Sequence, residues 1–166
     1  MKLPLIKKIL SHLSEELNIL LVAANNAHLA ATDEQSIAET QYDTLAIEAG
    51  YLAEGQSRRV GELKLAITAF ENLAEMLKQT SDRHQYIKIG SVVQLSQDQS
   101  ANQYFFIAPA AAGFRCSISC DIKERNFTVI TPQSPMGKAL LNKSIEDEVA
   151  IKLGNSQLND EIVYLE

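Results

Sequence analysis

Four carboxylates crowd into one short stretch of this chain. They lie within 11 residues and are Asp33, Glu34, Glu39 and Asp43. Like charges at such spacing repel and raise one another's pKa unless a cation joins them. Hard cations such as Mg²⁺ prefer carboxylate oxygens and often take their remaining ligands from a partner. The stretch is therefore a candidate for contact with a metal ion held mainly by another molecule.

Helix capping explains the same carboxylates without any metal. Asp33 or Ser36 would serve as the N-cap of a following helix, and Glu39 would then lie beside the positive end of that helix. The other acids would be solvated turn residues. The sequence leaves both interpretations open.

The surroundings of this stretch are also acidic. No Lys or Arg occurs between Lys8 and Arg58, whereas Glu15, Glu16, Glu48 and Glu54 join the four carboxylates in that interval. The whole chain has 166 residues and a net charge of −6. Such a field repels nucleic acid and anionic membranes, so any contact with nucleic acid must be local.

Two long apolar seams must position the acidic stretch. Residues at alternating spacings of four and three predict a helix on each side of it. The first seam is Ile6, Leu10, Leu13, Leu17, Leu20, Ala24 and Ala27, and the second is Tyr42, Leu45, Ala49, Leu52, Gln56, Val60, Leu63, Ile67, Phe70, Ala74 and Leu77. We predict an antiparallel coiled-coil hairpin over residues 1–79 with its tip near 31–41. One skip between Gly55 and Gly61 predicts a bend or a local rewinding there.

The sequence pattern of the remaining residues, 80–166, is typical of a small mixed α/β domain. Short runs rich in β-branched and aromatic residues predict strands at 86–95, 103–109, 114–120, 126–131, 148–153 and 161–165. Ser134 as N-cap and Pro135 at the first helical position predict a short helix between the strands at 126–131 and 148–153. The fold class expected for the chain is α+β.

Cysteine usage and hydropathy indicate a cytoplasmic protein without a membrane partner. No export signal and no span of about 18 apolar residues is found. Cys116 and Cys120 then read as reduced thiols, and their spacing is more typical of packing than of a metal site. The three histidines have no ligand spacing of a known metal motif.

The segment 128–151, TVITPQSPMGKALLNKSIEDEVAI, resembles the C-terminal signature of the Gre family of bacterial transcript-cleavage factors. The matching residues are Ser134, Pro135, Gly137, Lys138, Ala139, Leu140, Leu141, Lys143, Asp147 and Val149. Asn142 and Glu146 stand where the family has glycines. The similarity extends over nearly the whole chain: Tyr42, Tyr51, Glu54-Gly55 and Arg58 resemble the start of the family's second helix, while IKIGSVVQL and VYLE resemble the first and last strands of its FKBP-like domain.

The resemblance implies a specific role in transcription elongation. The partner would be bacterial RNA polymerase, with the FKBP-like domain docked at the rim of the secondary channel and the hairpin inside it. Carboxylates at the tip would help to hold the second Mg²⁺ of the polymerase active site, which cleaves backtracked RNA by a two-metal mechanism. The factor itself would be no enzyme and would hold no cofactor or permanent metal. Ser134, Pro135, Gly137 and Lys138 mark the docking domain.

Basic residues nearer the base of the hairpin are candidates for a second contact. Arg58, Arg59 and Lys64 could meet the nascent RNA 3′ end or an acidic polymerase surface. A solvated helix face explains them equally well.

The tip departs from the family pattern. Aligning the family's tyrosine on Tyr42 places its two catalytic acids at Gln35 and Ala38, so neither acid carries over. Asp33, Glu34 and Glu39 lie nearby with a different spacing. We therefore expect channel binding, and leave open whether it stimulates cleavage or inhibits. An FKBP-type isomerase or chaperone and a coiled-coil interaction protein are less favoured alternatives, the former because aromatic residues are few.

Overall fold

The computed structural model describes residues 1–32, 44–79, 85–120, 123–153 and 156–166. It divides into two compact units. Unit 1 comprises Met1–Leu10 together with Ala69–Glu166, and unit 2 comprises Ser11–Thr68.

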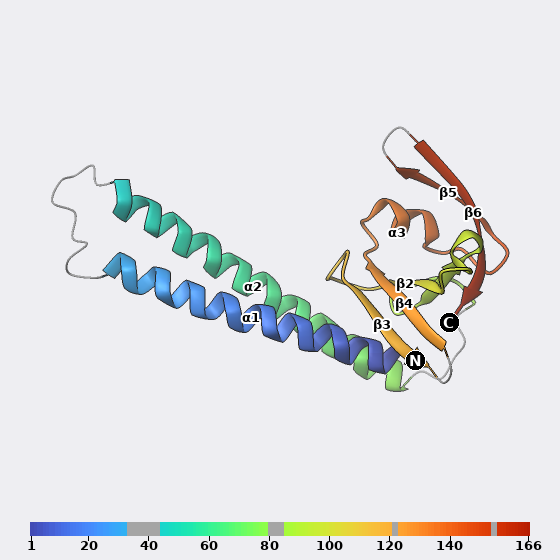
Figure 1. Ribbon diagram of the computed structural model, residues 1–166, viewed down its shortest axis with the longest axis horizontal. Helices are drawn as coiled ribbons and strands as arrows, with labels where there is room; N and C mark the ends of the chain where they lie inside the picture. The colour runs from blue at the N-terminus through green and yellow to red at the C-terminus, as the bar shows by residue number, and fades with distance from the viewer. Residues whose placement is uncertain (33–43, 80–84, 121–122, 154–155) are drawn as a thin grey trace. The chain divides into compact units, whose positions relative to one another are not determined.

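Both predicted long helices are present. Helix α1 spans Lys2–Thr32 (31 residues) and α2 spans Thr44–Gln79 (36 residues), as Figure 1 shows. Pro4 is tolerated because it lies in the first turn of α1, where its missing N–H has no helical partner to lose. Helix α2 runs through Gly55 and Gly61 without a break. No helix in the described part of the chain is long and apolar enough to cross a bilayer.

In unit 2 the two helices lie side by side along the predicted seam. Leu13, Val60 and Leu63 are buried there, with at most 8% of each side chain exposed. Gln56 occupies a seam position as well. Its Oε1 is buried and has no hydrogen-bond partner among the residues that the structure describes. Unit 2 is thus a two-helix layer whose stability comes from a narrow apolar contact.

Unit 1 contains a mixed six-stranded sheet of order β3-β4-β2-β1-β6-β5. The strands are β1 (Val92–Leu95), β2 (Gln103–Ile107), β3 (Arg115–Cys120), β4 (Lys123–Ile130), β5 (Glu148–Leu153) and β6 (Ser156–Leu165). Strands β2 and β4 pair in parallel, and the other neighbours are antiparallel. The chain is therefore α+β, with an N-terminal helical region and a mixed sheet.

The core of this sheet is aliphatic. Val93, Leu95, Ile107, Ile151 and Ile162 are fully buried. They pack with further apolar residues on helix α3 (Pro135–Leu140), whose Leu140 is also fully buried. The short helix therefore closes one face of the sheet and fixes the segment that carries the Gre-like signature.

The first strand is shorter than the sequence predicts. The expected strand 86–95 is reduced to Val92–Leu95 because Gly90 has φ +91° and the Ser91 N–H donates back to the Lys88 carbonyl at 3.0 Å. Ile87 bonds instead to residues 142 and 143, through its N–H at 2.8 Å and its carbonyl at 2.9 Å. A turn thus replaces the first half of the predicted strand.

Candidate functional site

The four candidate metal-contact residues, Asp33, Glu34, Glu39 and Asp43, lie outside the described residues. Their contact with Mg²⁺ stays a prediction. Within the described ranges, no group of three or more His, Cys, Asp or Glu side chains is placed to hold a metal ion.

The predicted basic residues differ in their contacts and in their exposure. Arg59 Nη2 lies 3.0 Å from Glu16 Oε1 and so joins α2 to α1 within unit 2. Arg58 makes only a long contact, 3.9 Å from Nε to Glu62 Oε1, and its side chain is 83% exposed. Lys64 is exposed too. Arg59 is therefore engaged in the hairpin, whereas Arg58 and Lys64 are accessible to a partner.

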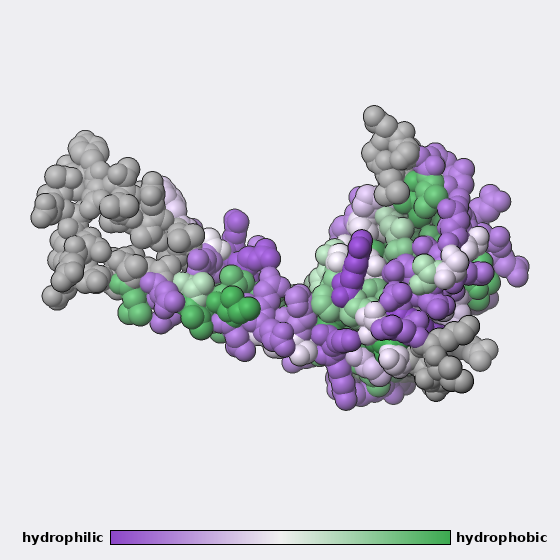
Figure 2. Space-filling view, viewed as in Figure 1, coloured by the Kyte–Doolittle hydropathy of each residue, from purple (hydrophilic) through white to green (hydrophobic). Residues whose placement is uncertain are grey.

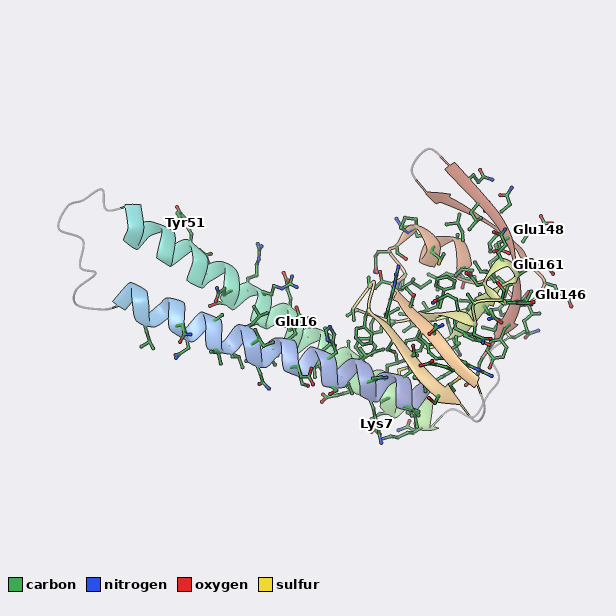
Figure 3. The ribbon with its side chains drawn as sticks, viewed as in Figure 1. Lys7, Glu16, Tyr51, Glu146, Glu148 and Glu161 are labelled. Atoms are coloured by element: carbon green, nitrogen blue, oxygen red, sulfur yellow. The ribbon has the colours of Figure 1, made fainter. Side chains whose placement is uncertain are left out.

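An aromatic residue accompanies Arg58 on the outward side of α2. Tyr51, labelled on α2 in Figure 3, is 71% exposed. It precedes Arg58 by seven residues, and this spacing places both on one face of the helix. Aromatic rings stack on unpaired bases and guanidinium groups bind phosphate oxygens, so this pair has the chemistry for single-stranded RNA. The sequence showed Tyr51 only as part of the resemblance. Its exposure is what makes it a candidate contact.

The Ser-Pro-x-Gly segment begins α3 as the sequence predicts. Ser134 Oγ accepts a hydrogen bond from the Gly137 N–H at 3.0 Å and donates one to the Thr131 carbonyl at 2.8 Å. Pro135 occupies the first turn, where its fixed φ suits a helix start. At Gly137 an added Cβ would lie 2.0 Å from the Thr131 carbonyl oxygen. Glycine is therefore the residue that this turn accepts at its third helical position, while Lys138 remains exposed.

Two further signature positions have an unusual backbone. Asn142 has φ +63° and Glu146 has φ +72°, both in the left-handed region. These are the two positions at which the Gre pattern has glycine and this chain has another residue. Glycine adopts this region without strain, and asparagine tolerates it better than glutamate does. The backbone at both positions thus has the left-handed conformation that the glycines of the family pattern would adopt without strain.

Asp147 fixes the turn between these positions and β5. Its Oδ2 accepts hydrogen bonds from the Ser144 N–H at 2.7 Å and from Ser144 Oγ at 3.1 Å. The two bonds lower the pKa of the Asp147 carboxyl, and the Lys143 ammonium adds to the effect. The acidic residue of the signature is therefore a structural anchor.

An acidic hollow lies where β5 and β6 meet the 3₁₀ turn Ser96–Asp98. Its volume is about 580 Å³, and it is lined by Ser96, Gln97, Glu148, Val149, Ala150, Asn159, Asp160 and Glu161. Glu148 and Glu161 are directly opposite each other in the ladder, and Figure 3 shows them at this end of the sheet. Burial, reinforced by the charge of Asp160, raises the pKa of Asp98. The sequence does not predict this cluster, because the Ser96–Asp98 turn is far along the chain from β5 and β6 and only the fold brings them together.

The thiol of Cys116 is half-buried on β3, and burial raises its pKa. It is therefore protonated at neutral pH and a poor nucleophile.

Comparison with known proteins gives neither a matching family model nor a matching curated protein. Among solved structures, the transcription factor Gfh1 has 18% identity and a TM-score of 0.35, covering 94% of this chain and 92% of the other. GreA factor homolog 1 of Thermus thermophilus has the same identity and TM-score over 95% and 94%. Gfh1 of Thermus aquaticus has 16% identity and a TM-score of 0.34 over 93% and 92%. Such TM-scores are too low to establish a shared fold, so the chain's own residues must support any function.

Proposed function

We propose that this chain is a Gre-like cytoplasmic factor that binds bacterial RNA polymerase through its secondary channel and modulates elongation. The observation that carries the proposal is the backbone at residues 142 and 146. Four non-glycine residues in the described part of the chain have positive φ, namely Asn102, Ala111, Asn142 and Glu146. Two of the four fall on the glycine positions of the signature, which a chance sequence match does not explain.

Gly137 supports the same assignment independently. Its place between Ser134 and Lys138 leaves no room for a Cβ. The signature residues are thus those that this turn and its following loop require. In the proposal, this segment belongs to an FKBP-like domain that docks at the channel rim.

The helical region is suited to the proposed insertion. Helices of 31 and 36 residues are roughly 45 and 55 Å long at about 1.5 Å per residue. The interval from residue 9 to residue 57 contains no Lys or Arg. Carboxylates of this interval would then act on the Mg²⁺ of the polymerase active site, and Arg58 with Tyr51 would meet the RNA 3′ end.

Stimulated cleavage and inhibition remain two outcomes of one binding mode. Cleavage needs Asp33, Glu34 or Glu39 to position the second Mg²⁺ so that it activates water. Inhibition needs only that these acids hold the ion unproductively. In either case the polymerase is the enzyme, and this chain supplies neither a cofactor nor a catalytic residue of its own.

The test adds the purified protein to a stalled, backtracked bacterial elongation complex with Mg²⁺ and follows RNA length. Shortening that disappears when Asp33, Glu34 and Glu39 are replaced by Ala supports cleavage. Slower elongation without shortening supports inhibition. A matched control replaces three exposed glutamates elsewhere, Glu71, Glu75 and Glu124, by Ala and should behave as wild type. No association with polymerase would refute both forms of the proposal.

The isomerase alternative is disfavoured by the packing of four of the five aromatic residues between residues 90 and 160. Tyr104, Phe105, Phe106 and Phe127 are each at most 9% exposed. Tyr104 stacks on Phe127 with ring centroids 5.6 Å apart. These rings are committed to the core, whereas a prolyl isomerase needs them to line a cleft.

A further inference from the structure

Helix α1 carries a row of exposed aliphatic side chains in unit 2. Ile19 is 69% exposed, Val22 62% and Leu29 57%. Their spacings of three and seven residues place them on one face of the helix. We call these three residues the outer stripe. Figure 2 shows hydrophobic surface along this helix.

The outer stripe is distinct from the seam that joins the two helices. At about 100° per residue, Ile19 and Val22 point nearly opposite to Leu13 and Leu17. Leu13 is 3% exposed, so the seam side is already covered. Isolated exposed aliphatic residues are ordinary, whereas exposed apolar side chains that share one helix face are a candidate binding surface.

Charge decides which kind of surface can cover the stripe. Glu15 and Glu54 are exposed in unit 2, and the segment from residue 9 to residue 57 has no Lys or Arg to offset them. A second copy would bring equally acidic segments together, and an anionic membrane would repel them. A surface with an apolar centre and a rim of Lys or Arg would be attracted.

We propose that the outer stripe is a docking surface for an apolar strip on a partner protein, bordered by basic residues. This inference rests on the proposed function, in which the partner is RNA polymerase and the strip lies on the wall that the hairpin contacts. The stripe then supplies affinity, separately from the acids that act on the metal.

The experiment measures the Kd of full-length protein for bacterial core RNA polymerase. The variant Ile19→Gln, Val22→Gln, Leu29→Gln keeps good helix formers on the surface and removes the stripe. We expect its Kd to rise by about tenfold or more, because the buried apolar area of three aliphatic side chains is lost from the interface. The control Leu65→Gln changes a residue that is 74% exposed on α2 and should leave the Kd unchanged.

The outcomes separate this inference from the proposed function. If wild type does not bind polymerase, the proposed function fails and the inference fails with it. If wild type and the triple variant bind equally, only the inference is overturned. Sedimentation of wild type as a dimer that the triple variant abolishes would also overturn it, as would stripe-dependent flotation with phosphatidylcholine vesicles. Circular dichroism checks that the variant keeps its helices.

Discussion

Glu146 has a backbone conformation that costs stability in this chain. Its φ of +72° is strained for a residue with a Cβ. Glu146→Gly should therefore raise the free energy of unfolding by about 0.5–1 kcal/mol, since relief of the strain exceeds the extra chain entropy. Urea unfolding measures this. The same change at Glu148, an exposed residue of β5, should lower stability; a loss at both positions would contradict the assigned role of residue 146.

Gly137 should not tolerate even the smallest side chain. Gly137→Ala would place Cβ 2.0 Å from a backbone oxygen, and either α3 or the Thr131 turn must move. We expect a loss of about 2 kcal/mol or more in thermal unfolding. The control is Gly61→Ala in α2, where a Cβ would meet nothing within 4 Å and helix propensity favours alanine by about 1 kcal/mol. Equal effects would show that the Gly137 contact is relieved at little cost.

Asp147 gives the fold a defined dependence on acid. Hydrogen bonds from Ser144 lower the pKa of its carboxyl in the folded state. The stabilisation is therefore complete above the unfolded pKa, about 3.9, and is lost as the pH falls through the lower folded value. Asp147→Asn should be less stable than wild type at pH 7, and the difference should vanish at low pH. A difference that does not change with pH, measured by thermal melts between pH 2 and 7, would contradict this.

At this scale, the sequence predicts what depends on neighbouring residues. Ser134 and Pro135 were placed correctly at the start of α3 because capping is a local interaction. The left-handed backbone at Glu146 does not follow from glutamate itself, which rarely adopts it. The glycine of the Gre pattern at this position was the only sequence signal for it. Strand β6 begins earlier than the predicted 161–165, because Asp160 interrupts the alternation of apolar residues in this strand. Asp160 is buried, and its Oδ2 has no partner among the described residues.

The ladder between β5 and β6 places two negatively charged side chains opposite each other. Glu148 and Glu161 are directly paired and both exposed. Glu161→Lys should convert repulsion into attraction and stabilise unit 1 by about 0.2–1 kcal/mol. Glu161→Gln, which removes only the repulsion, should have a smaller effect. The gain should shrink in 1 M salt because exposed charges are screened; a gain that is independent of salt would point to another cause.

Elements whose hydrophobic pattern repeats over many residues were easier to predict than short ones. The alternating spacings of four and three located α1 and α2 over many turns, so single polar residues such as Gln56 did not hide them. Strand β1 was predicted too long because Ile87 and Ile89 alternate as a strand would, although Gly90 turns the chain. The parallel pairing of β2 with β4 could not be inferred, since it depends on contacts between distant segments.

For the molecule as a whole, hydrophobic periodicity predicted the division between helices and sheet. The acidic interval and the candidate tip residues could be read directly from the sequence. Whether these carboxylates come close together in space could not be predicted, because that depends on the path of the backbone that carries them. The outer stripe was equally hidden, since exposed and buried aliphatic residues alternate along α1 and only packing distinguishes them.

The composition of unit 1 has a consequence for how the protein is made. Residues 1–10 belong to the same compact unit as residues 69–166, and Leu5, Ile6 and Ile9 are almost fully buried. A ribosome releases these three side chains well before residues 69–166 of the same unit. They must therefore stay uncovered until part of that second segment has emerged. We expect the nascent chain to rely on a holding chaperone until then, and truncations that end before residue 69 to aggregate.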